Sequence, residues 1–189
     1  MKYIIGNWKA NKDFSQTKQW TDKFLTFDFS GLTDKLRIII CPPYPFIPYL
    51  FEQTKDISVI KIGSQDLSVY YEGAYTGEVP AKSLLGITKY AIIGHSERRH
   101  YFSESQHVLN NKVHQAFAHH IEPIFCVRGN DDPIPDGTKI IAYEPTSAIG
   151  TGENESVATI LDVKQTLKLN SHHLFIYGGS VNEKNAHLF

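Results

Sequence analysis

Residues 90–117 read YAIIGHSERRHYFSESQHVLNNKVHQAF, and this stretch contains the pattern that decides the fold. It opens with a short apolar run, Tyr90–Gly94, which is typical of a strand covered on both faces. After a polar turn, Ser103–Gln106 (Ser-Glu-Ser-Gln) predicts a capping box that begins a helix. One strand, one turn and one helix in this order indicate a βα unit. The apolar stripe of the helix is expected at Leu109, Val113, Ala116 and Phe117.

The same order of apolar run, polar turn and helical segment recurs along the chain. A second helix is predicted after Asn154, and a third near Phe14–Phe27. Such alternation predicts an α/β fold with a parallel sheet. The face of the second helix comprises Val157, Ile160, Leu161 and Leu167. The seven predicted strands are Tyr3–Asn7, Arg37–Cys41, Val59–Gly63, Tyr90–Gly94, Pro123–Val127, Lys139–Tyr143 and Leu174–Gly178.

Two parts of the chain interrupt this alternation. Residues 128–138 read RGNDDPIPDGT, and the two prolines and two glycines in this segment disfavour a helix. We predict a bare loop, because eleven extended residues reach roughly 36 Å, enough to return along a strand of about 20 Å. Nine residues follow Ser180, too few for another strand and its helix.

The composition is that of a globular protein. A length of 189 residues predicts a single domain over 1–189. Nineteen basic and 20 acidic residues give no electrostatic case for nucleic acid or an anionic membrane, and no apolar run approaches the roughly 18 residues of a membrane helix. Cys41 and Cys126 form neither a disulfide framework nor a metal motif. We therefore expect a cytoplasmic protein with no nucleic-acid or membrane partner.

Polar clusters follow four predicted strands, at the end where α/β proteins place ligand sites. His95 is a candidate acid or electrophile, and Glu144, at a partly desolvated strand end, is a candidate base. Taken singly, His95 is also compatible with a turn histidine, Glu144 with an ion-pair partner and Lys9 with a surface charge. The clusters are Asn7–Lys9, Gly94–Arg99, Glu144–Pro145 and Gly178–Ser180.

Three other features are weaker signals. The loop Ala148–Glu153 is a candidate anion cradle or lid, although a single Gly-x-Gly is also an ordinary turn and lacks the pattern of nucleotide-binding loops. The adjacent pairs His119–His120 and His172–His173 point apart on regular elements, so no metal site is predicted. The aromatic loop at Tyr70, Tyr71 and Tyr75 favours a protein interface.

Taken together, six motifs resemble those of the triosephosphate isomerase family. The resemblance runs from Lys2 to about Phe189. It implies a reduced or incomplete (β/α)8 TIM barrel with parallel strands. It also implies an isomerase of glycolysis and gluconeogenesis, which interconverts dihydroxyacetone phosphate and glyceraldehyde 3-phosphate through an enediolate, with no metal or organic cofactor. The motifs are Asn7–Lys9, Gly73–Glu78, Gly94–Arg99, Tyr143–Pro145, Ala148–Gly152 and Tyr177–Val181.

The resemblance also implies roles for single residues. Glu144 corresponds to the base that moves the proton and His95 to the neutral imidazole that polarises the carbonyl, a pairing for which this family is an established example. Lys9 resembles the cation that faces the enediolate and the substrate phosphate, and Asn7 its neighbouring hydrogen-bond donor. Glu97 resembles a second carboxylate in the Lys9 network.

Phosphate binding and assembly follow from the same resemblance. The N–H groups of Gly150 and Ser180 are expected on the substrate phosphate. Tyr75 and Thr76 are expected to reach into a second subunit, with Thr76 beside the partner's Lys9, which implies a homo-oligomer, most simply a homodimer. The lid is predicted over Pro145, Thr146, Ser147, Ala148, Ile149, Gly150, Thr151 and Gly152.

The chain departs from the family pattern in several places. Thr146–Ser147 stands where the family has an apolar residue and Trp, Arg128–Gly129 lacks the usual Glu, and Asp66 stands where Asn is usual. The first two changes indicate a refitted lid hinge. The fifth helix and the eighth strand, helix and phosphate loop have no counterpart. Because such barrels bind phosphate with the loops after strands seven and eight, we expect weaker phosphate binding and reduced activity.

Two functions from different classes remain open at this point. The first is a working isomerase of reduced activity, favoured by the intact set of Lys9, His95 and Glu144. The second is a catalytically impaired scaffold that acts as an assembly or binding protein, favoured by the missing phosphate loop. The isomerase is the main prediction, because a silent scaffold has no physical need for that set. A different sugar-phosphate enzyme is disfavoured, since all six motifs point to one reaction.

Overall fold

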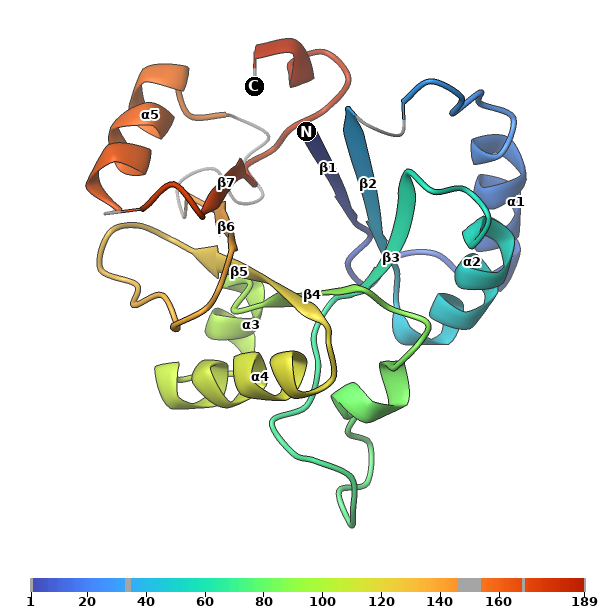
Figure 1. Cartoon of the computed structure of the whole chain (residues 1–189), viewed down its shortest axis with the longest axis horizontal. Coiled ribbons are helices and arrows are strands. Elements are labelled where there is room, and N and C mark those ends of the chain that lie inside the picture. The colour runs from blue at the N-terminus through green and yellow to red at the C-terminus, as the bar shows by residue number, and fades with distance from the viewer. Residues whose placement is uncertain (1, 33–34, 146–153, 168, 189) are drawn as a thin grey trace. The chain divides into compact units, whose positions relative to one another are not determined.

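The computed structural model describes residues 2–32, 35–145, 154–167 and 169–188 (Figure 1). Within these ranges strands alternate with helices, as predicted. Each strand begins and ends within one residue of its predicted bounds, so the strand prediction is confirmed. The strands are β1 (Lys2–Asn7), β2 (Leu36–Cys41), β3 (Ile60–Ser64), β4 (Tyr90–Ile93), β5 (Glu122–Val127), β6 (Ile140–Tyr143) and β7 (Leu174–Tyr177).

The helices are short and, except for the last 3-10 helix, they lie between strands in chain order. None of those in the described ranges is long and apolar enough to cross a membrane. The α-helices are α1 (Phe14–Phe24), α2 (Ile47–Thr54), α3 (Ser96–Tyr101), α4 (Gln106–Ala118) and α5 (Val157–Thr166). The 3-10 helices are η1 (Tyr44–Phe46), η2 (Ala81–Leu84) and η3 (Ala186–Leu188).

The chain packs as two compact units. The first comprises Met1–Ile92 and Gln115–Ile121, and the second comprises Ile93–His114 and Glu122–Phe189. In the first unit β1 pairs with β2, β2 with β3 and β3 with β4, all parallel. In the second unit β5 pairs with β6 and β6 with β7, again parallel. The expectation of one folding domain over 1–189 stays a prediction.

Each unit has an apolar core built from its strands. In the first unit Ile39 of β2 and Leu50 of α2 are fully buried, and α2 packs against β3. In the second unit Phe125 and Ile141 are fully buried, and β6 is buried at every position. Burial of consecutive strand residues explains why these strands read as continuous apolar runs rather than as alternating ones.

The capping prediction for α4 is wrong in position. The helix begins at Gln106, and Ser103 has a φ of 52°, in the left-handed region that a helix cap does not use. Ser105, directly before the helix, accepts the N–H of Val108 at 3.4 Å. The reason is α3, which ends at Tyr101 and forces the chain through a turn before α4 begins. Phe117, at the end of the predicted stripe, is exposed.

The predicted apolar face of α5 is partly wrong. Ile160 and Leu167 are buried, but Val157 and Leu161 are 40% and 49% exposed. Val163 is half-buried and continues the line of buried residues. The packed stripe is therefore narrow, with the spacing of positions 160, 163 and 167, and the apolar residues at 157 and 161 lie beside it.

The connection from β5 to β6 is a loop without a helix, as predicted. Side chains hold it in place instead of helical hydrogen bonds. Gln106 donates to the carbonyl of Pro133 at 3.1 Å, and Thr166 donates to the side-chain oxygen of Asn130 at 2.8 Å. The loop is thus tied to both α4 and α5.

Gly63 allows the strands of the first unit to approach closely. A Cβ at this position would lie 2.7 Å from the Cys41 sulfur and 3.3 Å from the Tyr90 carbonyl. We predict that Gly63→Ala lowers the free energy of unfolding by about 2 kcal/mol, since overpacking a filled core costs roughly 1–3 kcal/mol. Urea unfolding followed by circular dichroism measures this.

The control is Gly129→Ala, because a Cβ there meets no atom within 4 Å. It is expected to change the free energy of unfolding by less than about 1 kcal/mol, in the stabilising direction. Equal destabilisation by the two variants would contradict the packing argument.

Candidate active site

His95 lies between β4 and α3, separated from the strand by Gly94 and directly before the first residue of the helix. Gly94, with a φ of 76°, turns the chain out of the strand. His95 then caps the helix, and its Nδ1 accepts the backbone N–H of Glu97 at 3.2 Å. Only an unprotonated Nδ1 accepts a hydrogen bond, so the remaining ring proton is on Nε2. The fold therefore presents a neutral imidazole with an N–H donor at Nε2.

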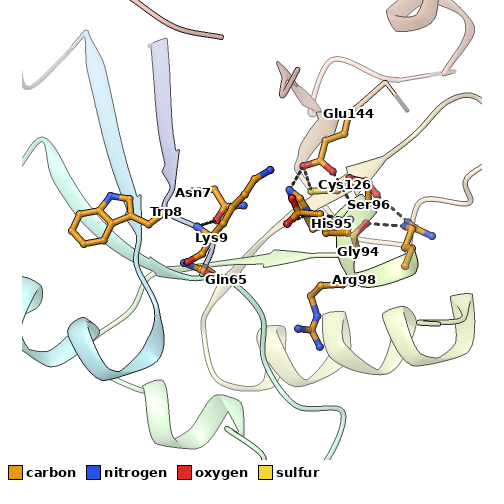
Figure 2. A network of polar contacts seen from close by, with 12 residues as sticks. Asn7, Trp8, Lys9, Gln65, Gly94, His95, Ser96, Arg98, Cys126 and Glu144 are labelled. Atoms are coloured by element: carbon orange, nitrogen blue, oxygen red, sulfur yellow. Dashed lines mark hydrogen bonds and ion pairs between the residues drawn. The ribbon is translucent and has the colours of Figure 1, made fainter. Parts of the chain in front are cut away.

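Glu144 follows β6, and three groups converge on its carboxylate (Figure 2). Oε1 lies 3.2 Å from His95 Nε2 and accepts from the Cys126 thiol at 3.3 Å. Oε2 accepts the backbone N–H of Ser96 at 3.0 Å. The residue is only 6% exposed. A nearly buried carboxylate thus lies against a neutral imidazole donor.

Backbone pairing fixes where Glu144 lies. Its N–H donates to the Val127 carbonyl at 2.8 Å, and the N–H of Gly178 donates to the Tyr143 carbonyl at 2.8 Å. A Cβ at Gly178 would lie 3.2 Å from Glu144 Cγ and 3.4 Å from the Tyr143 carbonyl. A glycine at this position therefore leaves the space that the Glu144 side chain occupies.

Lys9 lies in the first unit, in a turn after β1. Its φ of 53° places it in the left-handed region, which costs a non-glycine residue roughly 1–2 kcal/mol. Two hydrogen bonds hold this turn: Asn7 Oδ1 accepts the Lys9 N–H at 2.9 Å, and Gln65 donates to the Lys9 carbonyl at 2.9 Å. Gln65 also donates to the Cys41 carbonyl at 2.9 Å, which connects the turn to β2.

Sequence reasoning missed Gln65. The available signal was its position, because it follows β3 directly as His95 and Glu144 follow their strands. Glu97, which was singled out, is part of α3, and its carboxylate lies 3.7 Å from His95 Nδ1. Ser180 follows β7 with a φ of 36°, and its carbonyl accepts from Asn185 at 3.1 Å.

Most of the predicted lid lies outside the described residues. Pro145 is described and buried, but Thr146, Ser147, Ala148, Ile149, Gly150, Thr151 and Gly152 are not described.

Two tyrosines hold Glu155, which lies shortly after this segment in the chain. Tyr143 donates to the Glu155 carboxylate at 3.0 Å, and the Glu155 N–H donates to the Tyr177 hydroxyl at 3.0 Å. Burial, together with the Glu155 hydrogen bond, raises the pKa of Tyr143 to about 12, so this hydroxyl is a donor at neutral pH. The sequence does not predict this hydrogen bond between Tyr143 and Glu155.

The aromatic loop connects β3 to η2 (Figure 1). Contacts within the loop hold its shape. The rings of Tyr70 and Tyr75 stack at 3.9 Å with planes 5° apart, and both are nearly half exposed. The Ser68 N–H donates to Val79 at 3.0 Å and closes the loop. Thr76 is exposed beside Tyr75. The loop therefore presents an aromatic surface in a fixed shape.

The structure brings His95, Glu97 and Glu144 together in the second unit, and Asn7 and Lys9 together in the first. The His95–Glu144 pair combines a carboxylate able to accept a proton with an N–H donor able to stabilise an oxyanion. Within the described residues, no group of three or more His, Cys, Asp or Glu side chains is arranged to hold a metal ion.

The chain matches known proteins over nearly its whole length. A profile of the family described as Triosephosphate isomerase matches residues 2–134 and 135–189. The triosephosphate isomerase of Mesomycoplasma hyopneumoniae strain 232 is 37% identical over 211 residues, which cover 97% of this chain and 86% of that protein. Those of Hahella chejuensis and Dictyoglomus thermophilum are 32% and 33% identical and cover 98% and 97% of this chain, each over 86% of the relative.

Two predictions are confirmed by these matches and by the parallel strands: the family, and an α/β fold of the TIM-barrel class. The matches extend over nearly the whole chain, well beyond the six motifs that suggested the family. The chain belongs to the triosephosphate isomerase family.

Proposed function

We propose that the chain interconverts dihydroxyacetone phosphate and glyceraldehyde 3-phosphate, with Glu144 as the base and His95 as the electrophile. One observation carries the assignment of roles. The Glu97 N–H occupies His95 Nδ1, so the donor at Nε2 lies against the Glu144 carboxylate, 3.2 Å from Oε1. The family match supports the reaction itself, because the relatives are named for it.

The geometry indicates how the proton moves. The Glu144 carboxylate removes a proton from C1 of dihydroxyacetone phosphate, the C1–C2 double bond forms, and the electron pair of the carbonyl moves onto O2. The His95 Nε2–H donates a hydrogen bond to that developing oxyanion. The Nε2 proton of His95 then passes to O2 and the O1 hydroxyl proton replaces it on Nε2, so that the negative charge moves to O1. Glu144 returns its proton to C2, and the electron pair on O1 forms the C1=O1 bond of the aldehyde. The Ser96 N–H holds the carboxylate at 3.0 Å before substrate arrives.

The remaining predicted residues complete the proposal. Lys9 supplies a positive charge to the enediolate and the phosphate, and the Asn7 side chain, which accepts the Lys9 N–H at 2.9 Å, fixes its backbone. Glu97 is the second carboxylate of the proposed site, 3.7 Å from His95 Nδ1. The N–H groups of Gly150 and Ser180 bind phosphate, and the segment from Pro145 to Gly152 closes over it.

The scaffold alternative has no observation in its favour among the comparisons, since the family match and the relatives all bear the name of the isomerase. Reduced activity stays a prediction, and kcat/KM for the substrate measures it. We further propose that the reaction serves glycolysis and gluconeogenesis in the cytoplasm, in keeping with the family and with Cys41 and Cys126, which are both free thiols.

Glu144→Gln tests the proposed base. The amide keeps the shape of the side chain but accepts no proton, so we expect kcat to fall by roughly 10²–10⁴-fold. The measurement is a coupled isomerase assay. The control is Glu52→Gln, which replaces an exposed carboxylate on α2. Its kcat is expected to equal that of the chain without substitutions.

Binding of phosphoglycolate, a phosphate ester with a carboxylate in place of the enediolate, separates the two functions. An isomerase binds it competitively with substrate, whereas a scaffold shows neither turnover nor competition. Turnover that Glu144→Gln leaves unchanged would overturn the proposed mechanism.

Gly178→Ala tests the space left for Glu144. The added methyl group pushes on Glu144 Cγ, and because misplacing a reacting group by about 1 Å costs up to roughly 10²-fold, we expect kcat to fall about 10- to 100-fold. The KM is expected to change much less. The control in the same assay is Gly129→Ala, because the added methyl group has no atom within 4 Å. An unchanged kcat for Gly178→Ala would contradict the argument.

We propose that the aromatic loop forms the interface of a homodimer. Replacing both Tyr75 and Thr76 with Gly removes the stacked ring and is expected to reduce the mass measured by light scattering to roughly half. The control is Tyr101→Ala, which removes an exposed aromatic ring elsewhere, on α3. A mass that stays unchanged in the loop variant would contradict the proposed interface.

A further inference from the structure

We propose that Asp132, in the helix-free loop between β5 and β6, is a positioning residue for the His95–Glu144 pair and acts on it through Arg99. This inference rests on the proposed function, because its main readout is turnover. It assigns a role to a loop that the sequence presents only as a bare connection.

Asp132 is buried although its loop lies at the surface. Its Oδ2 accepts from Arg128 twice, from the backbone N–H at 2.8 Å and from Nε at 3.0 Å, and its Oδ1 accepts from Arg128 Nη2 at 2.6 Å. Burial alone raises the pKa of Asp132, but the hydrogen bonds from Arg128 and the charges of Arg99 and Arg128 outweigh it and hold the pKa below its usual value. The carboxylate is therefore ionised at neutral pH and held in one orientation.

The same carboxylate faces Arg99. Asp132 Oδ1 lies 3.7 Å from Arg99 Nη1, and both side chains are only 7% exposed. The neighbouring Arg98 points away from the His95–Glu144 pair (Figure 2) and donates to Glu104 at 2.8 Å. Glu104 also accepts from Lys112 at 2.6 Å. In the part of the chain that the structure describes, Asp132 is thus the carboxylate in ion-pair contact with Arg99.

Arg99 ties two strand ends together. Its Nε donates to the Gly94 carbonyl at 2.8 Å and its Nη2 donates to the Cys126 carbonyl at 3.0 Å. A Cβ at Gly94 would lie 3.0 Å from Arg99 Nη2, so the guanidinium packs directly against the turn. One planar group therefore sets the spacing between the end of β4 and the end of β5.

Both of these strand ends hold the proposed catalytic pair. Gly94 precedes His95 directly, and the Cys126 thiol donates to Glu144 at 3.3 Å. A rotation of the Arg99 guanidinium would shift the Gly94 turn relative to Cys126, and with it the imidazole relative to the carboxylate. The active pair is thus sensitive to what orients Arg99.

Charge explains why Arg99 needs Asp132. Burial lowers the pKa of Arg99, which means that its positive charge is disfavoured in this position, and the charge of Asp132 acts in the opposite direction. Without that carboxylate, the free energy of the guanidinium is lowered if the group moves toward water, because an unpaired buried charge is unfavourable. Arg128, by contrast, is nearly half exposed and can be solvated.

Four variants test the inference: Asp132→Asn, Arg99→Lys, the double variant, and Asp131→Asn as the exposed neighbouring control. We expect Asp132→Asn to lower kcat about tenfold and to change the KM by less than about twofold, since misplacement affects the reacting groups most. Arg99→Lys removes the planar fork, so in that background Asp132→Asn is expected to lower kcat by less than about twofold. Urea unfolding confirms that each variant is folded in the assay.

The NMR signal of the His95 ring is a readout that does not depend on turnover. The signal is assigned to His95 because it is absent from the spectrum of the His95→Gln variant. Asp132→Asn is expected to shift this signal, and Asp131→Asn is expected to leave it in place. A purely structural role would lower the unfolding midpoint without moving the signal.

The outcomes separate this inference from the proposed function. If the chain without substitutions shows no turnover and Asp132→Asn shifts the His95 signal, the isomerase proposal is overturned and the positioning role is supported. If the chain without substitutions is active and Asp132→Asn changes neither kcat nor the His95 signal, the positioning role alone is overturned. Equal loss of kcat in the presence and absence of Arg99 would also overturn it, because the effect would not pass through Arg99.

Discussion

The backbone N–H of Glu97 donates to His95 Nδ1 at 3.2 Å, and the chemistry of the site depends on this hydrogen bond. It uses the lone pair of one ring nitrogen, so the other carries the proton and is a donor. That donor meets Glu144, whose carboxylate also accepts from Ser96 and Cys126. A helix N-terminus thus determines the protonation pattern of a histidine, and the strand ends determine which carboxylate it meets.

Close backbone approaches make this arrangement possible. Gly94 turns the chain where Arg99 packs, and Gly178 leaves space for the Glu144 side chain. In both cases a methyl group would displace a residue of the site. The loop from β5 to β6 contributes in a different way: it lacks a helix, yet it places the buried Asp132 against Arg99. A connection that has lost its helix therefore still supports the site, through the contact of Asp132 with Arg99.

Much of this architecture is predictable from the sequence, and the exceptions have physical causes. Buried parallel strands read as continuous apolar runs, so their bounds are found within one residue, and the polar residues that follow them mark the site. The cap of α4 is misplaced, because the sequence does not show that α3 ends at Tyr101 and needs a turn at Ser103. Gln65 and Asp132 are missed because their roles depend on contacts 56 and 33 positions away in sequence, with Lys9 and Arg99.

The proposed chemistry requires that the His95 ring carry its proton on Nε2 and accept a hydrogen bond at Nδ1. Nitrogen-15 NMR of histidine-labelled protein tests this most directly, since the two ring nitrogens differ in chemical shift according to which one is protonated. We expect a protonated Nε2 and an unprotonated Nδ1 for the ring whose signals are absent from the spectrum of His95→Gln. A ring protonated on both nitrogens, or on Nδ1 alone, would contradict it.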